Sequence, residues 1–423
     1  MTSEDGHARR AVEAVWREES ARIVAALTRH TGDFAWAEDL AQEALVEALA
    51  TWPGSGIPSS PGAWLMSVAK RRAIDGWRRR ERFAQREPMF ATEVLEAETR
   101  DSVPDEADPD RIDDDVLRLV FVACHPVLPA QARLALTLRT VAGLTTEQIA
   151  RALLMTVPTV QQRIVRAKRS LAREGVPFEV PDRAERPARL ASVLQVIYLL
   201  FTEGYASAEG EGALRPDVAR EAVRLGRQLA ALMPREPEIW SLIALMEFQS
   251  SRFAARVDDD GLPVTLEDQD RRRWDRSAIS RGLEARARAD AAGRGLGYYG
   301  LQAAIAQCHA VAPTFAATDW NRILALYDAL ETLAPSAVVR LNRAVALSMV
   351  RGPEAALAVV DELETELKGF RPLSAVRAEL LERVGRPDAA AAAFLEAAAL
   401  PGNEAEAALL RRRAAALTGS PID

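Results

Sequence analysis

Cysteine is scarce in this chain, which has only two among its 423 residues. So few thiols exclude a disulfide framework of the kind that stabilises small secreted domains. Long apolar runs are lacking too, and no stretch is long enough to cross a bilayer as a helix. The first residues also lack the pattern of a secretory signal peptide. We therefore expect a cytoplasmic protein that does not enter a membrane.

Patterns typical of catalysis and metal binding are equally rare. We find no phosphate-binding glycine loop and no pairing of a nucleophile with a base, so we expect neither an enzyme nor a cofactor. Two adjacent pairs, Cys124-His125 and Cys308-His309, offer four ligands of the kind zinc prefers. Neighbouring residues on a helix diverge by about 100°, so each pair presents one ligand to a given side. We expect buried structural roles for these pairs and no metal site.

Strand-like alternation is rare as well, and apolar residues recur at helical spacing along most of the chain. The fold class we predict is all-α, with two small helical domains, the second a helix-turn-helix, followed by a C-terminal helical domain that is repeat-like mainly after residue 300. The length agrees with several domains. The predicted domains are residues 1–87, 113–174 and 188–423, and the predicted linkers are residues 88–112 and 175–187.

The helix-turn-helix is indicated by its capping residues and its charge. Thr145 and Gln148 can form a capping box, Thr156 is a second N-cap, and Pro158 falls in a first turn, where it needs no N–H. From Val157 to Arg173 there are five basic residues and no acid. Such a helix commonly lies in the DNA major groove, although a basic surface helix can show the same pattern. The residues expected to face the core are Ile149, Ala150, Leu153, Val160, Ile164, Ala167 and Leu171.

Charge is segregated along the chain, although the net charge is −7. Between Pro61 and Glu87 eight basic residues face three acids, whereas between Glu93 and Asp115 eleven acids face two basic residues. Two cationic segments thus flank an acidic connector. The overall charge argues against general coating of nucleic acid, and the pattern favours local contacts with DNA.

Two further helices precede the connector. Residues 36–50 place Glu38, Asp39, Gln42, Glu43 and Glu47 opposite an apolar face, and such a row can meet a basic partner or simply face solvent. Residues 62–82 form a basic helix with an apolar face that includes Ile74. Its Trp64 and Trp77 can stack on unpaired bases or pack in a core.

Taken in this order, the motifs resemble the extracytoplasmic-function sigma factors of bacterial RNA polymerase. The acidic segment Ala37–Leu45 is similar to the polymerase-clamp segment of that family. The segment Pro61–Asp75, with the arginines at 78–80, looks like its −10 segment, and the helix-turn-helix looks like its −35 reader. The resemblance implies a protein that binds core RNA polymerase, recognises both promoter elements and initiates transcription.

The resemblance also implies roles for individual residues. Arginine can bind guanine and glutamine can bind adenine through two hydrogen bonds each, whereas the later basic residues of the reader helix are expected at phosphates. The expected polymerase-binding residues are Asp39, Gln42, Glu43 and Glu47; those for the −10 element are Lys70, Arg71, Arg72, Trp77, Arg78, Arg79 and Arg80; and those for the −35 element are Thr159, Gln161, Gln162, Arg163, Arg166, Lys168 and Arg169. The chain departs from the family at Arg71, where asparagine is frequent, and at Pro158, where glycine is usual. The −10 base preference and the entry to the reader helix therefore stay open.

The acidic connector is long enough to join two promoter elements. At about 3.3 Å per residue, some 25–30 extended residues reach ~80–100 Å. Elements two duplex turns apart are separated by about 70 Å at 3.4 Å per base pair. Because its acidity would repel DNA, we hypothesise that the connector follows a basic polymerase channel meant for RNA.

The C-terminal part resembles the subgroup of these sigma factors with a fused tetratricopeptide-like extension, through residues 198–205 and 266–271. Pro234, Pro335 and Pro401 lie 101 and 66 residues apart, close to multiples of a 34-residue helix-pair period. The resemblance implies regulation by the fused domain, through a protein or peptide bound on its concave face. A non-repetitive helical domain is the alternative. We expect Asp258–Asp275 to be an exposed charged loop.

Two other functions fit parts of the sequence. One is a helix-turn-helix regulator that binds DNA without polymerase, and the other is a tetratricopeptide scaffold with an incidental N-terminal part. Run-off transcription with core polymerase distinguishes both from a sigma factor.

Overall fold

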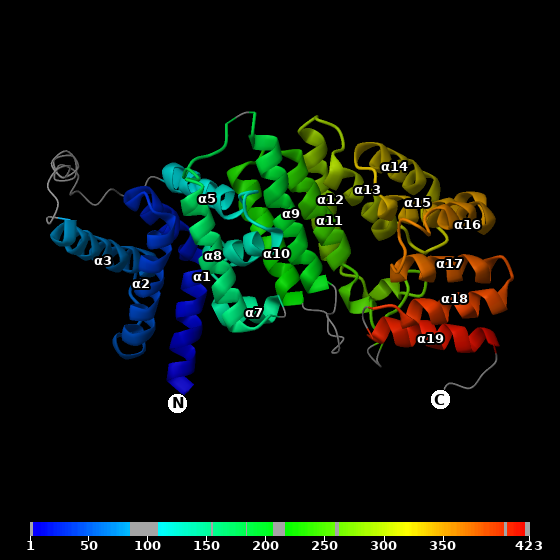
Figure 1. Ribbon diagram of the computed structural model, residues 1–423, viewed down its shortest axis with the longest axis horizontal. Helices are drawn as coiled ribbons and strands as arrows, with labels where there is room; N and C mark the ends of the chain where they lie inside the picture. The colour runs from blue at the N-terminus through cyan, green and yellow to red at the C-terminus, as the bar shows by residue number, and fades with distance from the viewer. Residues whose placement is uncertain are drawn as a thin grey trace. The chain divides into compact units, whose positions relative to one another are not determined.

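The structure, a computed structural model, describes residues 3–84, 109–153, 155–182, 184–205, 216–258, 262–401 and 404–418. In these ranges the regular elements are helices, and the only extended pairing is an isolated bridge between Val257 and Pro263. This confirms the all-α prediction. The chain divides into two compact units, Met1–Val196 and Ile197–Asp423. In Figure 1 the colour runs along the chain, from blue at the beginning of the first unit to red at the end of the second.

Unit 1 contains seven described helices and the beginning of an eighth. They are α1 (Ser3–Thr31), α2 (Phe34–Ser55), α3 (Pro61–Ala84), α5 (Pro109–Ala123), α6 (Ala130–Thr140), α7 (Thr146–Ala152), α8 (Val157–Arg173) and the first part of α9 (Arg186–Tyr205). Helix α1 packs against α2, α3 and α5. It therefore joins the two small domains that the sequence predicts as separate.

Local sequence explains where α2 begins and ends. The carboxylate of Asp33 caps the helix by accepting a hydrogen bond from the Trp36 N–H at 3.0 Å. Gly56 ends it at a φ of +83°, a conformation that favours glycine. The predicted apolar face is buried at Ala37, Leu40, Ala41, Ala44, Leu45 and Ala48 and half-buried at Leu49.

Helices α5 and α9 begin inside the segments predicted as linkers, at Pro109 and Arg186. Helix α5 begins at Pro109, within the predicted linker 88–112, and residues 88–108 lie outside the described residues. The beginning of α9 packs on the end of α5, where Ser192 donates to the Cys124 carbonyl at 2.7 Å and Arg189 donates to the Phe121 carbonyl at 3.0 Å. Carbonyls at a helix end have no partner within their helix, and these two side chains satisfy them.

The described part of unit 2 consists of helices and two short 3₁₀ turns. After the end of α9 come α10 (Pro216–Leu232), α11 (Pro237–Ser250), η1 (Phe253–Ala255), η2 (Arg271–Arg273), α12 (Arg276–Ala291), α13 (Tyr298–Val311), α14 (Trp320–Leu333), α15 (Ala337–Arg351), α16 (Pro353–Glu362), α17 (Arg371–Arg383), α18 (Pro387–Ala399) and α19 (Glu404–Thr418).

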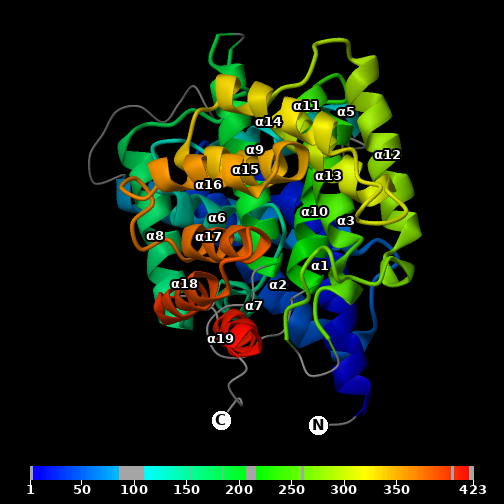
Figure 2. The same ribbon diagram turned by 90° about the vertical axis from the view of Figure 1, so that its right-hand side faces the viewer.

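The last six helices recur at a regular interval. Helices α14, α16 and α18 begin at 320, 353 and 387, and helices α15, α17 and α19 begin at 337, 371 and 404. Both series therefore advance by 33 or 34 residues. Each helix packs against the next, as Figure 2 shows from the end of the stack. Stacking on neighbours at this interval is typical of helix-pair repeats.

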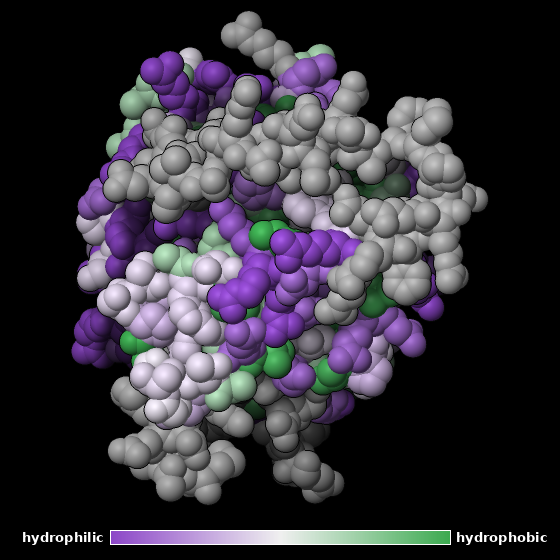
Figure 3. Space-filling view, turned by 90° about the vertical axis from the view of Figure 1, so that its left-hand side faces the viewer, coloured by the Kyte–Doolittle hydropathy of each residue, from purple (hydrophilic) through white to green (hydrophobic). Residues whose placement is uncertain are grey.

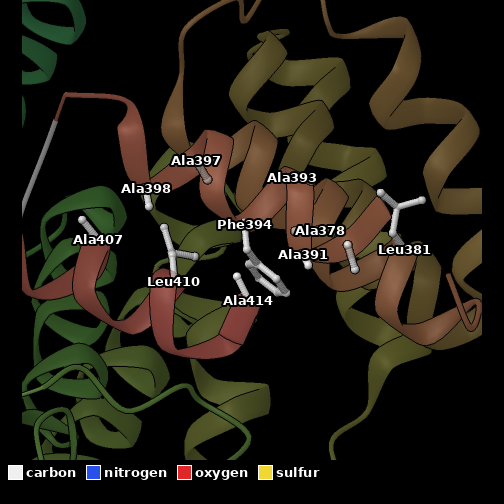
Figure 4. Packing of buried hydrophobic residues seen from close by; sticks show 11 residues of the cluster. Ala378, Leu381, Ala391, Ala393, Phe394, Ala397, Ala398, Ala407, Leu410 and Ala414 are labelled. Atoms are coloured by element: carbon white, nitrogen blue, oxygen red, sulfur yellow. The ribbon is translucent and has the colours of Figure 1, made fainter. Parts of the chain in front are cut away.

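Small residues let the final helices of the stack approach closely. Phe394 of α18 is fully buried and points between α18 and α19, toward Leu410 and Ala414 (Figure 4). Apart from Leu381 and Leu410, the other buried members of this cluster are alanines, so the one large ring occupies the space that they leave. The guanidinium of Arg413 covers the ring at 4.5 Å from its centre.

The segment Asp258–Asp275 is not the fully exposed loop that we expected. The guanidinium of Arg271 donates to the carbonyls of His309 and Ala312, both at 2.7 Å, and stacks on Trp274. Trp274 is only 3% exposed. The charged sequence of this segment led us to expect exposure, but Arg271 and Trp274 hold the segment against α13.

Candidate nucleic-acid interface

The helix-turn-helix forms with the predicted caps and core. The Thr145 N–H donates to the Gln148 side chain at 2.9 Å, and the Gln148 N–H donates to the Thr145 hydroxyl at 3.2 Å. Thr156 caps α8, and Pro158 lies in its first turn. All seven residues predicted to face the core are buried: Ile149, Ala150, Leu153, Val160, Ile164, Ala167 and Leu171.

The opposite side of α8 presents most of the expected −35 residues. Exposed side chains there are Gln161, Gln162, Arg166 and Arg169. Arg163 is half-buried and donates to Gln131 at 3.2 Å, and the Thr159 hydroxyl lies 2.8 Å from that of Thr156. These interactions hold Arg163 and Thr159 near the start of the exposed side, where a recognition helix usually meets bases.

Helix α3 carries its basic residues next to aromatic pairs. Lys70, Arg71 and Arg78 are exposed. Trp77 packs edge-on against Trp36 with 5.8 Å between ring centres. The second pair, Trp64 with Trp52, has 5.3 Å between centres, which favours a packing role for Trp64. The side chains of Arg79 and Arg80 lie outside the described residues. Ile74, which we expected in the core, is 46% exposed.

The acidic residues of α2 do not form a free row. Asp39 and Glu43 are exposed, and Gln42 and Glu47 are half-buried. Arg72 of α3 donates to Glu43 at 2.9 Å and to Glu47 at 2.7 Å, and these hydrogen bonds raise the pKa of its guanidinium. Arg72, which we expected to contact the −10 element, is therefore paired with Glu43 and Glu47, which we expected to contact the polymerase. The face shown in Figure 3 is mainly hydrophilic or neutral among its coloured residues, with small separate hydrophobic patches.

The prediction for Glu38 is wrong. The sequence places it on the solvent side of α2, but it is only 3% exposed. Its carboxylate accepts hydrogen bonds from Arg139 of α6, at 3.1 Å, and from Lys168 of α8. These cations come from residues 101 and 130 positions later, so no local pattern could reveal the burial.

Lys168 also differs from the expected exposed phosphate contact. Its side chain is 12% exposed and donates to Glu38 and, at 2.9 Å, to Asp39. Burial by itself lowers the pKa of this amine, but the two carboxylates outweigh it, so the pKa is raised and the amine stays charged. Arg139, which our sequence analysis missed, completes the cluster.

The two Cys-His pairs have buried thiols. Cys124 lies 3.2 Å from the Thr137 hydroxyl, and burial raises the pKa of its thiol to about 11. Burial, with a contribution from Arg189, lowers the pKa of His125 to about 4. Cys308 is buried as well, and burial lowers the pKa of His309 to about 4. Within the described ranges no three His, Cys, Asp or Glu side chains gather in a way that could hold a metal ion.

Unit 2 contains a pocket of about 810 Å³ on one side of its helical stack. Its wall combines parts of α14, α15, α17 and α19 with Thr265–Asp268. The apolar and aromatic lining includes Trp320, Tyr327, Val345 and Met349, and the charged lining includes Glu267, Glu379, Glu382, Arg383, Arg412 and Arg413.

None of the described helices is both long enough and apolar enough to cross a membrane.

Two family models match unit 1. Residues 15–83 match Sigma-70 region 2, which covers most of α1 and α2 and nearly all of α3, and residues 118–171 match Sigma-70 region 4, which includes α7 and most of α8. The ECF RNA polymerase sigma factor SigL of Mycobacterium tuberculosis is 31% identical over 159 residues, 37% of this chain and 85% of that protein. The chain belongs to the extracytoplasmic-function family of RNA polymerase sigma factors.

This sigma factor has a second match that extends over nearly its whole length. An uncharacterized protein of Rhizobium meliloti (strain 1021) is 44% identical over 402 residues, 95% of this chain and 94% of that protein. Residues 189–290 match a family of unknown function, DUF6596. The combination of sigma regions with this C-terminal part is therefore shared with another bacterial protein.

Proposed function

We propose that this sigma factor, bound to core RNA polymerase, reads the −10 element with α3 and the −35 element with α8. Promoter recognition and initiation of transcription are the work of its family, and region 2 and region 4 are the matched parts. The observation that carries the assignment is the exposed cationic side of each helix, Lys70, Arg71 and Arg78 on α3 and Arg166 and Arg169 on α8. Cations on these sides can bind the DNA backbone while neighbouring side chains contact bases.

The acidic side of α2 is the proposed contact with core polymerase. Asp39 and Glu43 are its exposed carboxylates, and Gln42 and Glu47 flank them. Complementary charge increases the association rate and fixes the register of such an interface. We infer a protein without enzymatic activity of its own that works in the cytoplasm, together with the polymerase and the chromosome.

Reconstituted transcription tests this proposal. With core polymerase and a template carrying both elements, the purified protein is expected to direct run-off transcripts, and Asp39→Ala with Glu43→Ala should lower their yield at limiting polymerase. The matched control is Glu354→Ala with Glu362→Ala, two acids on α16 of unit 2. Specific binding to promoter duplex without polymerase, together with a failure to yield transcripts, would instead identify a free-standing regulator.

We also propose that unit 2 is a tetratricopeptide-like array that modulates this activity by binding a peptide segment of a regulatory protein. The 33- or 34-residue interval of α14–α19 supports an array of this kind. The pocket supports the partner, because its apolar lining residues suit a side chain and its glutamates and arginines can pair with both charges of a peptide.

A substitution in the pocket tests the modulation. Asn342 of α15 lines the pocket and is exposed, so Asn342→Arg should obstruct it and change promoter output in cells. Asn321→Arg on α14 is the control, because Asn321 is exposed and does not line the pocket. Equal output from both variants and the unsubstituted protein would contradict the proposal.

A further inference from the structure

Two glutamates in the wall of the unit 2 pocket already have a cationic partner. Glu379 and Glu382 of α17 line the pocket, and Arg413 of α19 donates to each of them at 2.7 Å. The same guanidinium lies over the ring of Phe394, which limits where it can move. The charges of these carboxylates are therefore compensated within the helical stack, and they offer little attraction to a cationic ligand.

Two other arginines of the pocket wall lack such compensation from the described helices of the stack. Arg412 of α19 is exposed, and no carboxylate among the described residues pairs with it. Arg383 of α17 is exposed as well. Within the stack its guanidinium contacts the Ser348 hydroxyl at 3.4 Å and the Met349 sulfur at 3.0 Å, and both groups are neutral. Because uncompensated cations attract anions, this side of the pocket favours an acidic ligand.

An acidic stretch of the chain itself already lies at one of these cations. Thr265–Asp268, which we call the tip, forms the part of the pocket wall that does not belong to the stack. Its Leu266 is half-buried, and its two acids are exposed. Glu267 lies 3.8 Å from Arg383. The tip thus presents an apolar side chain followed by two acids to the pocket, and this order indicates the chemistry that fits there.

The tip is held much less firmly than the rest of its segment. The side chains of Glu267 and Arg383 are 59% and 38% exposed, and exposed ion pairs contribute little to stability. The turn of the tip is closed by hydrogen bonds within the segment, which need no contact with the stack. Arg271 and the buried Trp274, by contrast, anchor the following residues. The tip can therefore leave the pocket while its anchors stay in place.

We propose that the pocket binds an acidic peptide of the regulatory protein, in which an apolar residue precedes acidic ones, and that this peptide displaces the tip. Its acids pair with Arg383 and Arg412, and its apolar side chain packs on lining residues such as Tyr327 and Met349. The complementary charge selects acidic partners over basic ones. This inference rests on the proposed function of unit 2 as a peptide-binding modulator, and it adds the charge of the peptide and the competitor within the chain.

Peptide binding to the full-length protein tests the inference. The probe is a dye-labelled synthetic peptide with the sequence of residues 264–269, and the comparison peptide carries glutamine and asparagine in place of its two acids. Fluorescence anisotropy at low salt measures both affinities. The acidic peptide should bind about tenfold more tightly than the neutral one, and Arg412→Glu should lower its affinity about tenfold.

Three further variants make the test decisive. Arg383→Gln should also lower the affinity for the acidic peptide, which guards against misfolding of one variant. Glu267→Gln should raise that affinity about threefold, because the tip loses its ion pair with Arg383. Arg322→Glu on α14 is the control and should leave the affinity unchanged, because Arg322 is exposed and does not line the pocket. Circular dichroism identifies the variants that are folded.

Equal binding of the acidic and neutral peptides, or equal affinity of the unsubstituted protein and both folded arginine variants, would overturn the acidic partner. An unchanged affinity in Glu267→Gln would overturn displacement of the tip. If neither peptide binds, the inference fails, and the promoter output of Asn342→Arg still decides whether the pocket modulates transcription. If the acidic peptide binds as expected but Asn342→Arg leaves promoter output unchanged, the peptide site stands and its regulatory role fails.

Discussion

At the scale of single residues, neighbours in sequence have different environments. Glu38 is buried among cations, whereas the next residue, Asp39, has a side chain that is 67% exposed. Both are acids on the same helix, so composition and periodicity place them on the same side. The difference arises because α8 covers Glu38 but contacts only one edge of Asp39.

Glycine positions show the same dependence on the surroundings. Gly282 of α12 faces the ring of Phe248, and a Cβ atom added there would lie 2.6 Å from the ring carbon Cε1. Phe248 is 1% exposed and cannot move aside freely. Gly54 of α2, by contrast, has open space around its Cβ direction.

Gly282→Ala is therefore expected to destabilise the protein. Overpacking a filled core typically costs about 1–3 kcal/mol of the free energy of unfolding. Gly54→Ala, the control, should leave that free energy unchanged or raise it by up to about 1 kcal/mol, because alanine is the better helix former. Chemical denaturation followed by circular dichroism measures both. A Gly282→Ala protein as stable as the control would show that α12 and α11 separate easily.

At the scale of elements, α8 is the part that local sequence describes best. Its cap, its proline and its buried stripe all follow from residues within one or two turns of one another. The environment of Lys168 does not follow from this local sequence, because a second element, α2, decides it. Local patterns thus define this helix but do not reveal which of its charges are available.

We expect different roles for two arginines of α8, the half-buried Arg163 and the exposed Arg169. Arg163→Ala should relax base preference at one position of the −35 element, a loss of about 1–3 kcal/mol of discrimination. Arg169→Ala should weaken binding to all sequences alike and reduce the salt dependence by about one unit. Titration of the polymerase complex with variant −35 duplexes at several salt concentrations measures both. If Arg169→Ala altered base preference instead, the assignment of these two arginines would be reversed.

At the scale of the whole molecule, the acidic connector separates region 2 from region 4 in sequence. Its residues between 88 and 108 lie outside the described residues, so its role rests on charge and length alone. It has the length to let the regions separate by the distance that a promoter demands. Its acidity also agrees with a path through a basic channel of the polymerase.

Neutralising part of the connector tests that path. Replacing Glu93, Glu96 and Glu98 by glutamine should lower run-off transcript yield, because attraction to a basic channel is lost. The control replaces three exposed acids of unit 2, Asp361, Glu362 and Glu364, by their amides. Equal yields from the connector variant, the control and the unsubstituted protein would contradict the proposed path of the connector through a basic channel.

The helical fold and the caps and core of the helix-turn-helix could be predicted from the chain alone, because they depend on interactions within a few turns or on composition. The order of motifs indicated a sigma factor through its resemblance to that family. The burial of Glu38, the pairing of Arg72 with Glu43 and Glu47, and the anchoring of a charged segment by Arg271 are visible only in the folded protein. Each of these joins separate elements, and the free energy of a charge depends on what surrounds it in space.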